Sequence, residues 1–310
     1  MAEKKSVSTA SMSRDDWLEA RRAGIGGSDA GAICGLNPYR SPIDVWMDKT
    51  GRAVEQPDKE AMRLGRDLEQ YVADRFTEQT GLKVRKDNRI LKSKDFPFML
   101  ANIDRRVVGE NAILECKTAS PYNAYLWKDG NCPESYEIQC HHYMAVTGAA
   151  KVYLAALILG VDFVIVEVNR DEDLIRNLCN IEEHFWKHNV LANEMPVPDG
   201  SDAATKAIKE MFPDATEKTV DLSHMQALLE RYDNIHKLED ELEEEKDSIK
   251  QQFQMAMQDA DTAYIGERKL TWKNAKPRII VDSKRLKAEA PEIFQAYGKE
   301  VKPGRTFRIW

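Results

Sequence analysis

Apolar side chains recur at spacings of three to four residues in several parts of the chain, and this pattern predicts helices. The segment SRDDWLEARR is expected to form a short helix capped by Ser13, and the Gly-rich turn GIGGSDAGAICG leads into a second short helix capped by Ser28 or Asp29. A longer helix is expected from about Asp58 to Gln79. It should end at Gly81, because glycine readily adopts the left-handed conformation at a helix end.

Shorter apolar runs bounded by turn residues predict strands around Asn88 to Leu91, Phe98 to Val108 and Ala112 to Thr118. A helix carrying YEIQCHHYMAV follows and should stop at Gly148. The runs KVYLAALILG and DFVIVEVNR lie so close in sequence that they should pair as a hairpin. With a closing helix from about Glu172 to Leu191, this order predicts an α/β fold with a mixed sheet flanked by helices.

The chain is expected to divide into four parts. Residues 1–12 are interpreted as a mobile leader, 13–194 as the α/β domain, and 195–220, with NEMPVPDGSDAAT, as a linker. Residues 221–310 should form an amphipathic helix of about 35 residues, because apolar residues recur at threes and fours, and a small basic tail. In that tail, AYIGERKLTWKN and RTFRIW are expected to be strands that bracket a short helix. The apolar stripe of the long helix could pack on its own chain, on another subunit or on a partner.

Composition restricts the class of protein. The chain has 310 residues, of which 42% are hydrophobic and 31% charged, which is typical of a soluble globular protein. No apolar run approaches the roughly 20 residues of a membrane span. The start MAEKKSVSTASMSRDD lacks the apolar centre of a signal peptide, so a cytoplasmic location is expected. The five cysteines are an odd number without a C-x-x-C pair, which argues against a disulfide framework or a zinc site.

The net charge of −7 conceals a strong local asymmetry. Six basic residues and one acidic residue lie between Leu82 and Lys94, and the region from Met195 to Asp261 is acidic, with 17 acidic and seven basic residues. Taken alone, the basic segment could be a solvated sheet edge. Beside a site that acts on nucleic acid, its side chains would instead contact phosphates. The candidates are Lys83, Arg85, Lys86, Arg89 and Lys92.

Three acidic residues and a lysine are the candidates for chemistry. In the predicted strand AILECKTAS, Glu115 and Lys117 lie on one face, which alone would suggest an exposed ion pair. Asp104 lies in the preceding predicted strand, so its carboxylate could meet that of Glu115 at one end of the sheet. Two such carboxylates repel unless a cation neutralises them, and Mg²⁺ or Mn²⁺ suits oxygen ligands. The carbonyl of Cys116 could be a further ligand, and Glu69 on the long predicted helix a third acid.

Further polar residues lie on the later helix, where Gln139 and Tyr143 are four positions apart and His141 is near them. Asp104 followed by Glu115-x-Lys117, with Glu69 on an earlier helix, resembles the PD-(D/E)XK nuclease fold. More narrowly, the set resembles the YqaJ and lambda-exonuclease family of phage recombination nucleases. The stretches WLEARRAGIGGSDAGAICGLNPYRSPIDVWMDKTG and IQCHHYMAVTG are similar to the opening and the later helix of YqaJ-type members.

The resemblance implies roles for these residues. Asp104 and Glu115 would be the principal metal ligands, supported by Glu69, and Lys117 would orient or help to deprotonate the attacking water. Gln139 and His141 would position the site, with Tyr143 nearby, although His141 stands where the family commonly has glutamine. Arg21 and Ser28 would contact a 5′ phosphate. Arg105 replaces the small residue that often follows the aspartate, and it could reach DNA or be solvated.

The function implied by the resemblance is a Mg²⁺-dependent 5′→3′ exonuclease that degrades one strand of linear duplex DNA to 5′-mononucleotides and leaves a 3′ overhang for annealing-type recombination. A single-strand annealing protein as partner and a ring-shaped trimer are also family traits. Two alternatives stay open: an endonuclease of the same fold, and a non-catalytic protein that binds DNA ends. The turn GIGGSDAG matches neither nucleotide-binding glycine motif, so it favours a DNA terminal phosphate over a nucleotide cofactor.

Overall fold

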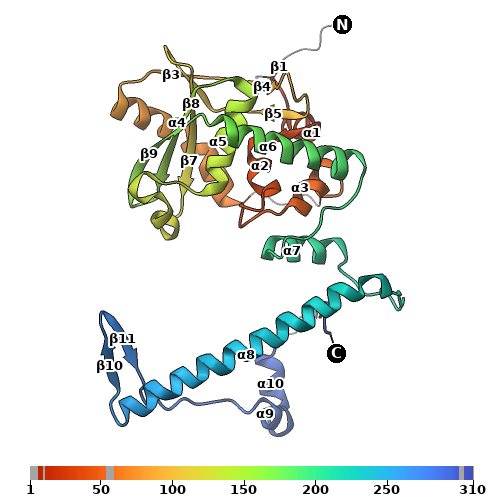
Figure 1. Ribbon diagram of the computed structural model, residues 1–310, viewed down its shortest axis with the longest axis vertical. Coiled ribbons are helices and arrows are strands. Elements are labelled where there is room, and N and C mark those ends of the chain that lie inside the picture. The colour runs from red at the N-terminus through yellow and green to blue at the C-terminus, as the bar shows by residue number, and fades with distance from the viewer. Residues whose placement is uncertain (1–5, 10, 54–58, 300–303, 310) are drawn as a thin grey trace. The chain divides into compact units, whose positions relative to one another are not determined.

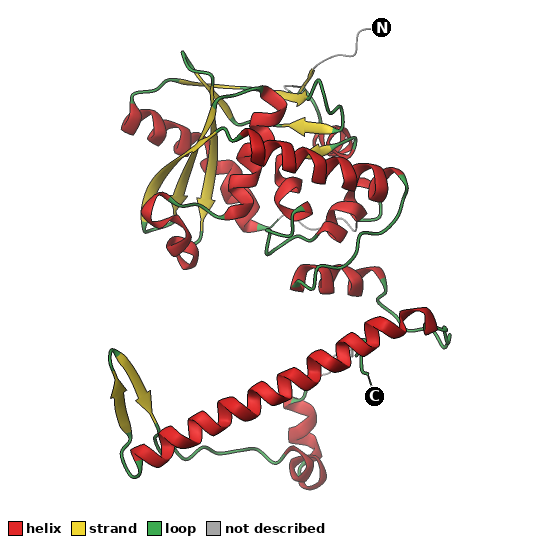
Figure 2. Ribbon diagram, in the orientation of Figure 1, coloured by secondary structure: helices red, strands yellow, loops and turns green. Residues whose placement is uncertain are grey.

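The computed structural model describes residues 6–9, 11–53, 59–299 and 304–309 (Figure 1). It separates into two compact units, Met1–Pro213 and Asp214–Trp310. In the first unit, helices lie on both faces of a β-sheet (Figure 2). The predicted mixed α/β class is therefore confirmed. Among the described residues, no helix combines the length and apolarity that crossing a membrane requires.

The main sheet has five strands in the order β3-β6-β7-β8-β9. Strand β7 runs parallel to β8, and every other neighbouring pair in this sheet is antiparallel. The predicted third strand and the predicted hairpin are both present. The strand bounds are β3 Val84–Lys86, β6 Arg105–Val107, β7 Ala112–Ala119, β8 Lys151–Ile158 and β9 Asp162–Asn169.

Two helices bury the opposite faces of this sheet. Helix α4, Glu60–Thr80, packs Phe76 against the face that carries Leu114, and it ends at Gly81 with a left-handed φ of 74°, as predicted. Helix α5, Glu134–Thr147, packs against the other face and ends at Gly148. Because side chains alternate along a strand, residues 113, 115 and 117 of β7 face α5, whereas residues 114 and 116 face α4.

A second sheet of four strands has the order β1-β4-β5-β2, with bounds β1 Ser6–Ser8, β4 Arg89–Lys92, β5 Met99–Ala101 and β2 Ile25–Gly26. It corrects two predictions. Residues 6–8 of the predicted leader form an edge strand that pairs with β4, while residues 1–5 and 10 lie outside the described residues. The predicted strand 98–108 is two strands in different sheets, β5 and β6, because the chain leaves one sheet and enters the other at residues 102–104.

The N-terminal helices form a separate apolar cluster beside the sheets. Helix α1, Arg14–Arg22, has Ser13 as its N-cap, as predicted. Helix α2, Gly27–Ile33, starts earlier than either predicted cap, because Gly26 is the N-cap and its N–H donates to the Asp29 carboxylate. Helix α3, Pro42–Lys49, was not predicted, and its Ile43 packs in this cluster.

The predicted linker 195–220 is partly structured. Helix α6, Glu172–His184, continues as a π-helical segment, Phe185–Leu191, and a further helix, α7, Asp202–Met211, follows. The buried Ala204 and Ala207 of α7 pack in the same cluster as α3. The prediction failed here because the alanines, rather than large apolar residues, form the buried face of this short helix.

The second unit is built around helix α8, Gln226–Met257, the predicted long amphipathic helix. A hairpin of β10, Thr262–Ile265, and β11, Arg268–Thr271, follows. The tail then forms two short helices, α9, Ser283–Glu289, and α10, Pro291–Tyr297. The predicted strand RTFRIW is wrong for residues 305–309, which have no regular structure, and residue 310 lies outside the described residues.

Candidate active site

Four of the predicted site residues meet between β7 and α5. The Nζ atom of Lys117 donates to Glu115 Oε1 and to Gln139 Oε1, at 2.9 Å in both cases. The Gln139 amide donates to the same Glu115 oxygen at 2.7 Å and to the Tyr143 hydroxyl at 2.9 Å. Glu115, Gln139 and Tyr143 are each 5% exposed or less. The charges of Glu115 and Lys117 are therefore held in fixed positions, not on the surface.

Asp104 stands beside this group, at the point where the chain enters β6. Its Oδ2 accepts a hydrogen bond of 2.8 Å from the backbone N–H of Cys116, so the backbone between Glu115 and Lys117 lies next to this carboxylate. Burial raises the pKa of Asp104 well above its usual value, and repulsion from Glu115 and then Glu69 raises it further. Two carboxylates therefore share one small region, and the charge of Glu115 opposes the ionisation of Asp104.

The donor set fits a divalent cation. One oxygen of Glu115, Oε2, is buried and has no hydrogen-bond partner among the described residues. An unpartnered buried carboxylate oxygen is unfavourable unless a positive charge or a donor satisfies it. With the neighbouring Asp104 carboxylate, it offers the hard oxygen ligands that Mg²⁺ and Mn²⁺ prefer.

Glu69 is not joined to this pair in the structure. It lies on α4 and its Oε1 accepts a hydrogen bond from the Arg105 guanidinium, which forms an ion pair across the α4 face of the sheet. Among the described residues, no three His, Cys, Asp or Glu side chains are grouped so that they could hold a metal. Arg105, predicted to reach DNA or solvent, is instead 3% exposed. The solvated alternative is therefore wrong, because Arg105 is buried against Glu69, whereas a contact with DNA stays a prediction.

His141 is also placed differently from its prediction. Its Nδ1 lies 3.0 Å from the Glu137 carbonyl, and its side chain is buried on another face of α5 from that of Gln139 and Tyr143. The neighbouring His142 is fully buried between Glu182 Oε1 and the Leu100 carbonyl, at 2.8 Å from each. In the described structure, therefore, neither histidine is hydrogen-bonded to Glu115, Lys117, Gln139 or Tyr143, although the His142 ring lies edge-on to the Tyr143 ring, with 6.2 Å between centroids.

Tyr136 is a site residue that the sequence did not indicate. Its ring lies 4.5 Å from Lys117 Nζ, in the position of a cation–π contact. Burial lowers the pKa of Lys117, but attraction to Glu115 and the neighbouring Tyr136 outweighs this and raises it above the usual value. The only hint in the sequence was the one-turn spacing of Tyr136 and Gln139 on the same helix.

Arg21 and Ser28, the predicted phosphate contacts, are brought together beside this group. Arg21 Nη2 donates to Ser28 Oγ at 2.9 Å. Ser28 follows Gly27, which packs directly on Tyr143 and Gln139. A cation and a hydroxyl at the start of α2 can bind a phosphate group, and Ser28 is adjacent in sequence to the contact with α5.

A buried ionic network that was not predicted lies beside Arg21 and the start of α2. Asp29 forms ion pairs with Arg40 and, at 2.7 Å, with Lys49 Nζ, and the side chains of Asp29 and Lys49 are each 1% exposed. Lys49 Nζ also donates to the Arg21 carbonyl at 3.1 Å. Burial raises the pKa of Asp29, but attraction to Arg40 and Lys49 outweighs burial and holds it far below its usual value. The network fixes the backbone of Arg21.

Gly27 provides a direct test of this packing. A Cβ atom at Gly27 would lie 2.5 Å from Tyr143 Cε1 and 3.0 Å from Gln139 Cγ, so Gly27→Ala should displace both side chains and lower activity on DNA by about tenfold or more. The matched control is Gly65→Ala on α4, where the new Cβ meets only Thr118 Oγ1, at an ordinary 3.5 Å. We expect the control to be neutral or up to about 1 kcal/mol more stable. Equal activities of the two variants would contradict this packing.

The predicted basic segment is divided by the fold. Lys83, Arg85 and Lys86 lie at the exposed edge of the main sheet, around β3. Arg89 lies on β4 and forms two hydrogen bonds with Asp87, at 2.5 and 2.7 Å, and Lys92 ends the same strand. The predicted phosphate contacts therefore fall in two groups on different sheets, and Arg89 already has an acidic partner.

Comparison with known proteins gives a consistent picture. The family model described as YqaJ-like viral recombinase domain matches residues 16–150. The chain is 40% identical over 294 residues to the Uncharacterized protein YqaJ of Bacillus subtilis (strain 168), a match that covers 93% of this chain and 92% of that protein.

Two solved structures share the fold at low sequence identity. The alkaline exonuclease LHK-Exo from Laribacter hongkongensis matches with a TM-score of 0.50 and 18% identity, over 58% of this chain and 94% of the other. LHK-Exo in complex with dAMP matches with a TM-score of 0.51 and 18% identity, over 64% of this chain and 97% of the other. At this level of identity, the likeness concerns the fold alone.

Proposed function

Because this chain belongs to the YqaJ-like viral recombinase family, we propose that it is a Mg²⁺-dependent nuclease that degrades one strand of linear duplex DNA in the 5′→3′ direction. The products would be 5′-mononucleotides and a 3′ single-stranded overhang for recombination by annealing. One observation carries the proposal: in the buried pair of Asp104 and Glu115, the Oε2 atom of Glu115 has no hydrogen-bond partner among the described residues, and Lys117 is fixed beside it.

The position of each residue suggests its proposed role. Asp104 and Glu115 would hold Mg²⁺ or Mn²⁺, and Glu69, which is paired with Arg105 in the structure, would be a third acid. A bound divalent cation would lower the pKa of a water molecule and neutralise charge on the phosphate. Lys117 Nζ, held by Glu115 and Gln139, carries a positive charge that can orient that water and stabilise the negative charge that develops on the phosphate oxygens. Tyr143 and Tyr136 restrict the positions of Gln139 and Lys117.

The position of Arg21 and Ser28 supports the proposed polarity. A 5′ terminal phosphate bound between them would lie at the start of α2, which packs on α5 through Gly27. The 5′ end of the DNA strand would then lie beside Asp104, Glu115 and Lys117, so that the first phosphodiester bond is the one cut. The related fold that binds dAMP accommodates a mononucleotide, which is consistent with a product of that size.

The proposal extends to partners and location. A nuclease that leaves a 3′ overhang requires a protein that anneals the exposed strand, so a single-strand annealing protein is the proposed partner. A ring-shaped trimer would keep duplex DNA enclosed during repeated cutting. The cytoplasm, of a bacterial host if the gene belongs to a phage or prophage, is the compartment where this DNA would be available.

One assay separates the proposed activity from its alternatives. Linear duplex and covalently closed circular duplex are incubated with the full-length chain, with and without Mg²⁺, and released nucleotides are measured together with nicking of the circle. We expect nucleotide release from the linear duplex only, and only with Mg²⁺. Nicking of the circle would instead support an endonuclease, and metal-independent binding without release would support a DNA-end-binding protein.

A further inference from the structure

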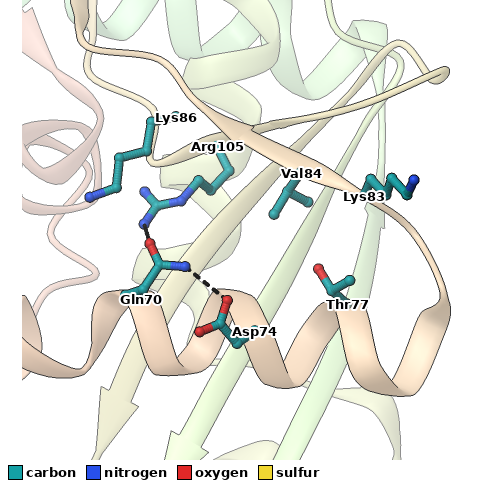
Figure 3. Close-up of a pocket in the computed structure, with 7 residues that line it drawn as sticks. All are labelled: Gln70, Asp74, Thr77, Lys83, Val84, Lys86 and Arg105. Atoms are coloured by element: carbon teal, nitrogen blue, oxygen red, sulfur yellow. Dashed lines mark hydrogen bonds between the residues drawn. The ribbon is translucent and has the colours of Figure 1, made fainter.

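A polar cleft of about 480 Å³ opens between α4 and the edge strand β3 of the main sheet. Figure 3 shows that Gln70, Asp74 and Thr77 point into it from the helix, that Arg105 lies next to Gln70, and that Lys86 lies at the same end of the cleft. Lys83 lies at the opposite end. The cleft is lined by Gln70, Asp74, Thr77, Lys83, Val84, Lys86 and Arg105.

Arg105 connects this cleft to the candidate active site. Its Nη1 donates to Glu69 and, at 2.9 Å, to the Asp104 carbonyl, while its Nη2 donates to Gln70 Oε1 at 3.2 Å. The guanidinium therefore touches the backbone of one proposed ligand, Asp104, and the carboxylate of another, Glu69. Its other side forms part of the cleft wall. An anion that binds Arg105 from the cleft would therefore compete with Glu69 for the same guanidinium.

The chemistry of the cleft favours an anion. Three cationic side chains line it, and neither Lys83 nor Lys86 forms an ion pair with another described residue. The one acid of the lining, Asp74, accepts a hydrogen bond of 2.8 Å from Gln70. A planar guanidinium beside an ammonium group suits the paired oxygens of a phosphate diester. Phosphate groups recur along a DNA strand, so the edge of this sheet can bind one phosphate while the end of the DNA strand lies elsewhere.

We propose that the cleft binds a backbone phosphate of duplex DNA between Arg105 and Lys86, and that this binding draws Arg105 away from Glu69. The inference rests on the proposed action on DNA, and it adds a step to it. Without DNA, Arg105 forms an ion pair with Glu69, and among the described residues Glu69, Asp104 and Glu115 are not grouped so that they could hold a metal. With DNA, the phosphate competes for the same guanidinium, and Glu69 becomes available to complete the metal-binding group.

The coupling must be reciprocal, because Glu69 and the phosphate compete for one cation. Removing the charge of Glu69 should therefore strengthen DNA binding even when no metal is present. This consequence distinguishes the proposal from simple attraction between DNA and a basic edge, in which every acid on α4 would weaken binding to a similar degree.

The test measures affinity of the full-length chain for a fluorescently labelled duplex of about 20 base pairs in the presence of a chelator, by fluorescence anisotropy. Glu69→Gln is expected to bind the duplex about fivefold more tightly than the wild type, and Lys86→Gln about fivefold more weakly. Asp67→Asn, which removes an exposed charge from the same helix, is the matched control and should change affinity by less than about twofold. The gain in Glu69→Gln should vanish when it is combined with Arg105→Gln.

A second readout uses Mn²⁺ alone, detected by electron paramagnetic resonance without DNA. Arg105→Gln is expected to bind Mn²⁺ about tenfold more tightly than the wild type, because Glu69 is released. The proposal is overturned if Glu69→Gln binds DNA no better than Asp67→Asn, or if its gain persists without Arg105. Neither measurement needs hydrolysis. A chain that passes both tests but releases no nucleotides would refute the proposed nuclease activity alone, and a nuclease that fails them would refute only this coupling.

Discussion

Replacing Lys117 with glutamine is expected to slow nucleotide release from linear duplex DNA by on the order of 10²–10⁴-fold. The reason is positional. Lys117 Nζ is held by Glu115 and Gln139 at 2.9 Å and lies over the Tyr136 ring, and glutamine at this position can supply neither the positive charge nor the reach of the ammonium group. Single-turnover kinetics with saturating enzyme would measure the loss at the chemical step.

Two controls separate chemistry from folding in this experiment. Lys187→Gln removes an exposed lysine outside the site, one whose ion pair with Glu183 lies on the surface, and its rate should match that of the wild type. The thermal midpoint of Lys117→Gln shows whether the fold is retained. A folded Lys117→Gln variant with a rate within about threefold of the wild type would contradict the role assigned to this lysine.

Asp29→Asn is expected to lower the free energy of unfolding by about 3 kcal/mol. The substituted amide keeps the shape of the side chain but carries no charge, so Lys49, which is 1% exposed, and Arg40 keep their charges without the buried partner. Urea unfolding followed by circular dichroism would measure the change.

Asp48→Asn is the matched control. Asp48 contacts the same two cations at longer distances and is 32% exposed, so its replacement should lower the free energy of unfolding by less than about 1 kcal/mol. Equal effects of the two variants would contradict the central position of Asp29.

The same network predicts a dependence on pH. The pKa of Asp29 lies below its ordinary value of 3.8 in the folded chain, so this group contributes stability that is fully present above that value. The contribution is lost as pH falls below 3.8 toward the folded pKa, because the unfolded chain then binds a proton that the folded chain does not. The stability of Asp29→Asn should therefore fall less steeply than that of the wild type below this pH.

Features with a local cause could be predicted from the sequence. Alternation along residues 112–118 places Glu115 and Lys117 on one face, and the structure keeps that arrangement. The hairpin of β8 and β9 follows from two apolar runs with a minimal turn between them, and the end of α4 follows from Gly81. The four-residue spacing of Gln139 and Tyr143 likewise brought them to one face of α5, where they are hydrogen-bonded.

Features that depend on distant parts of the chain could not be predicted. The run FMLANIDRRVV contains neither glycine nor proline, so no turn residue signals that it changes sheets near Asp104. Arg105 and Glu69 are 36 positions apart, and their ion pair depends on the packing of α4 against the sheet. His141 and His142 are adjacent, and which of them faces the interior pair with Glu182 depends on the contact between α5 and α6. The sequence therefore did not indicate that the immediate partner of Arg105 is Glu69, an acid of the candidate site.

The most direct test of the account is nucleotide release from linear duplex DNA by the wild type and by Asp104→Asn, prepared identically and assayed with Mg²⁺ and with a chelator. The Asp104 carboxylate accepts a hydrogen bond from the backbone of Cys116 and lies close enough to Glu115 for the two carboxylates to repel each other. The account predicts release by the wild type with Mg²⁺ alone, and at least about 10³-fold less release by a folded Asp104→Asn. Release by Asp104→Asn at a rate near that of the wild type, or release by the wild type in the chelator, would contradict it.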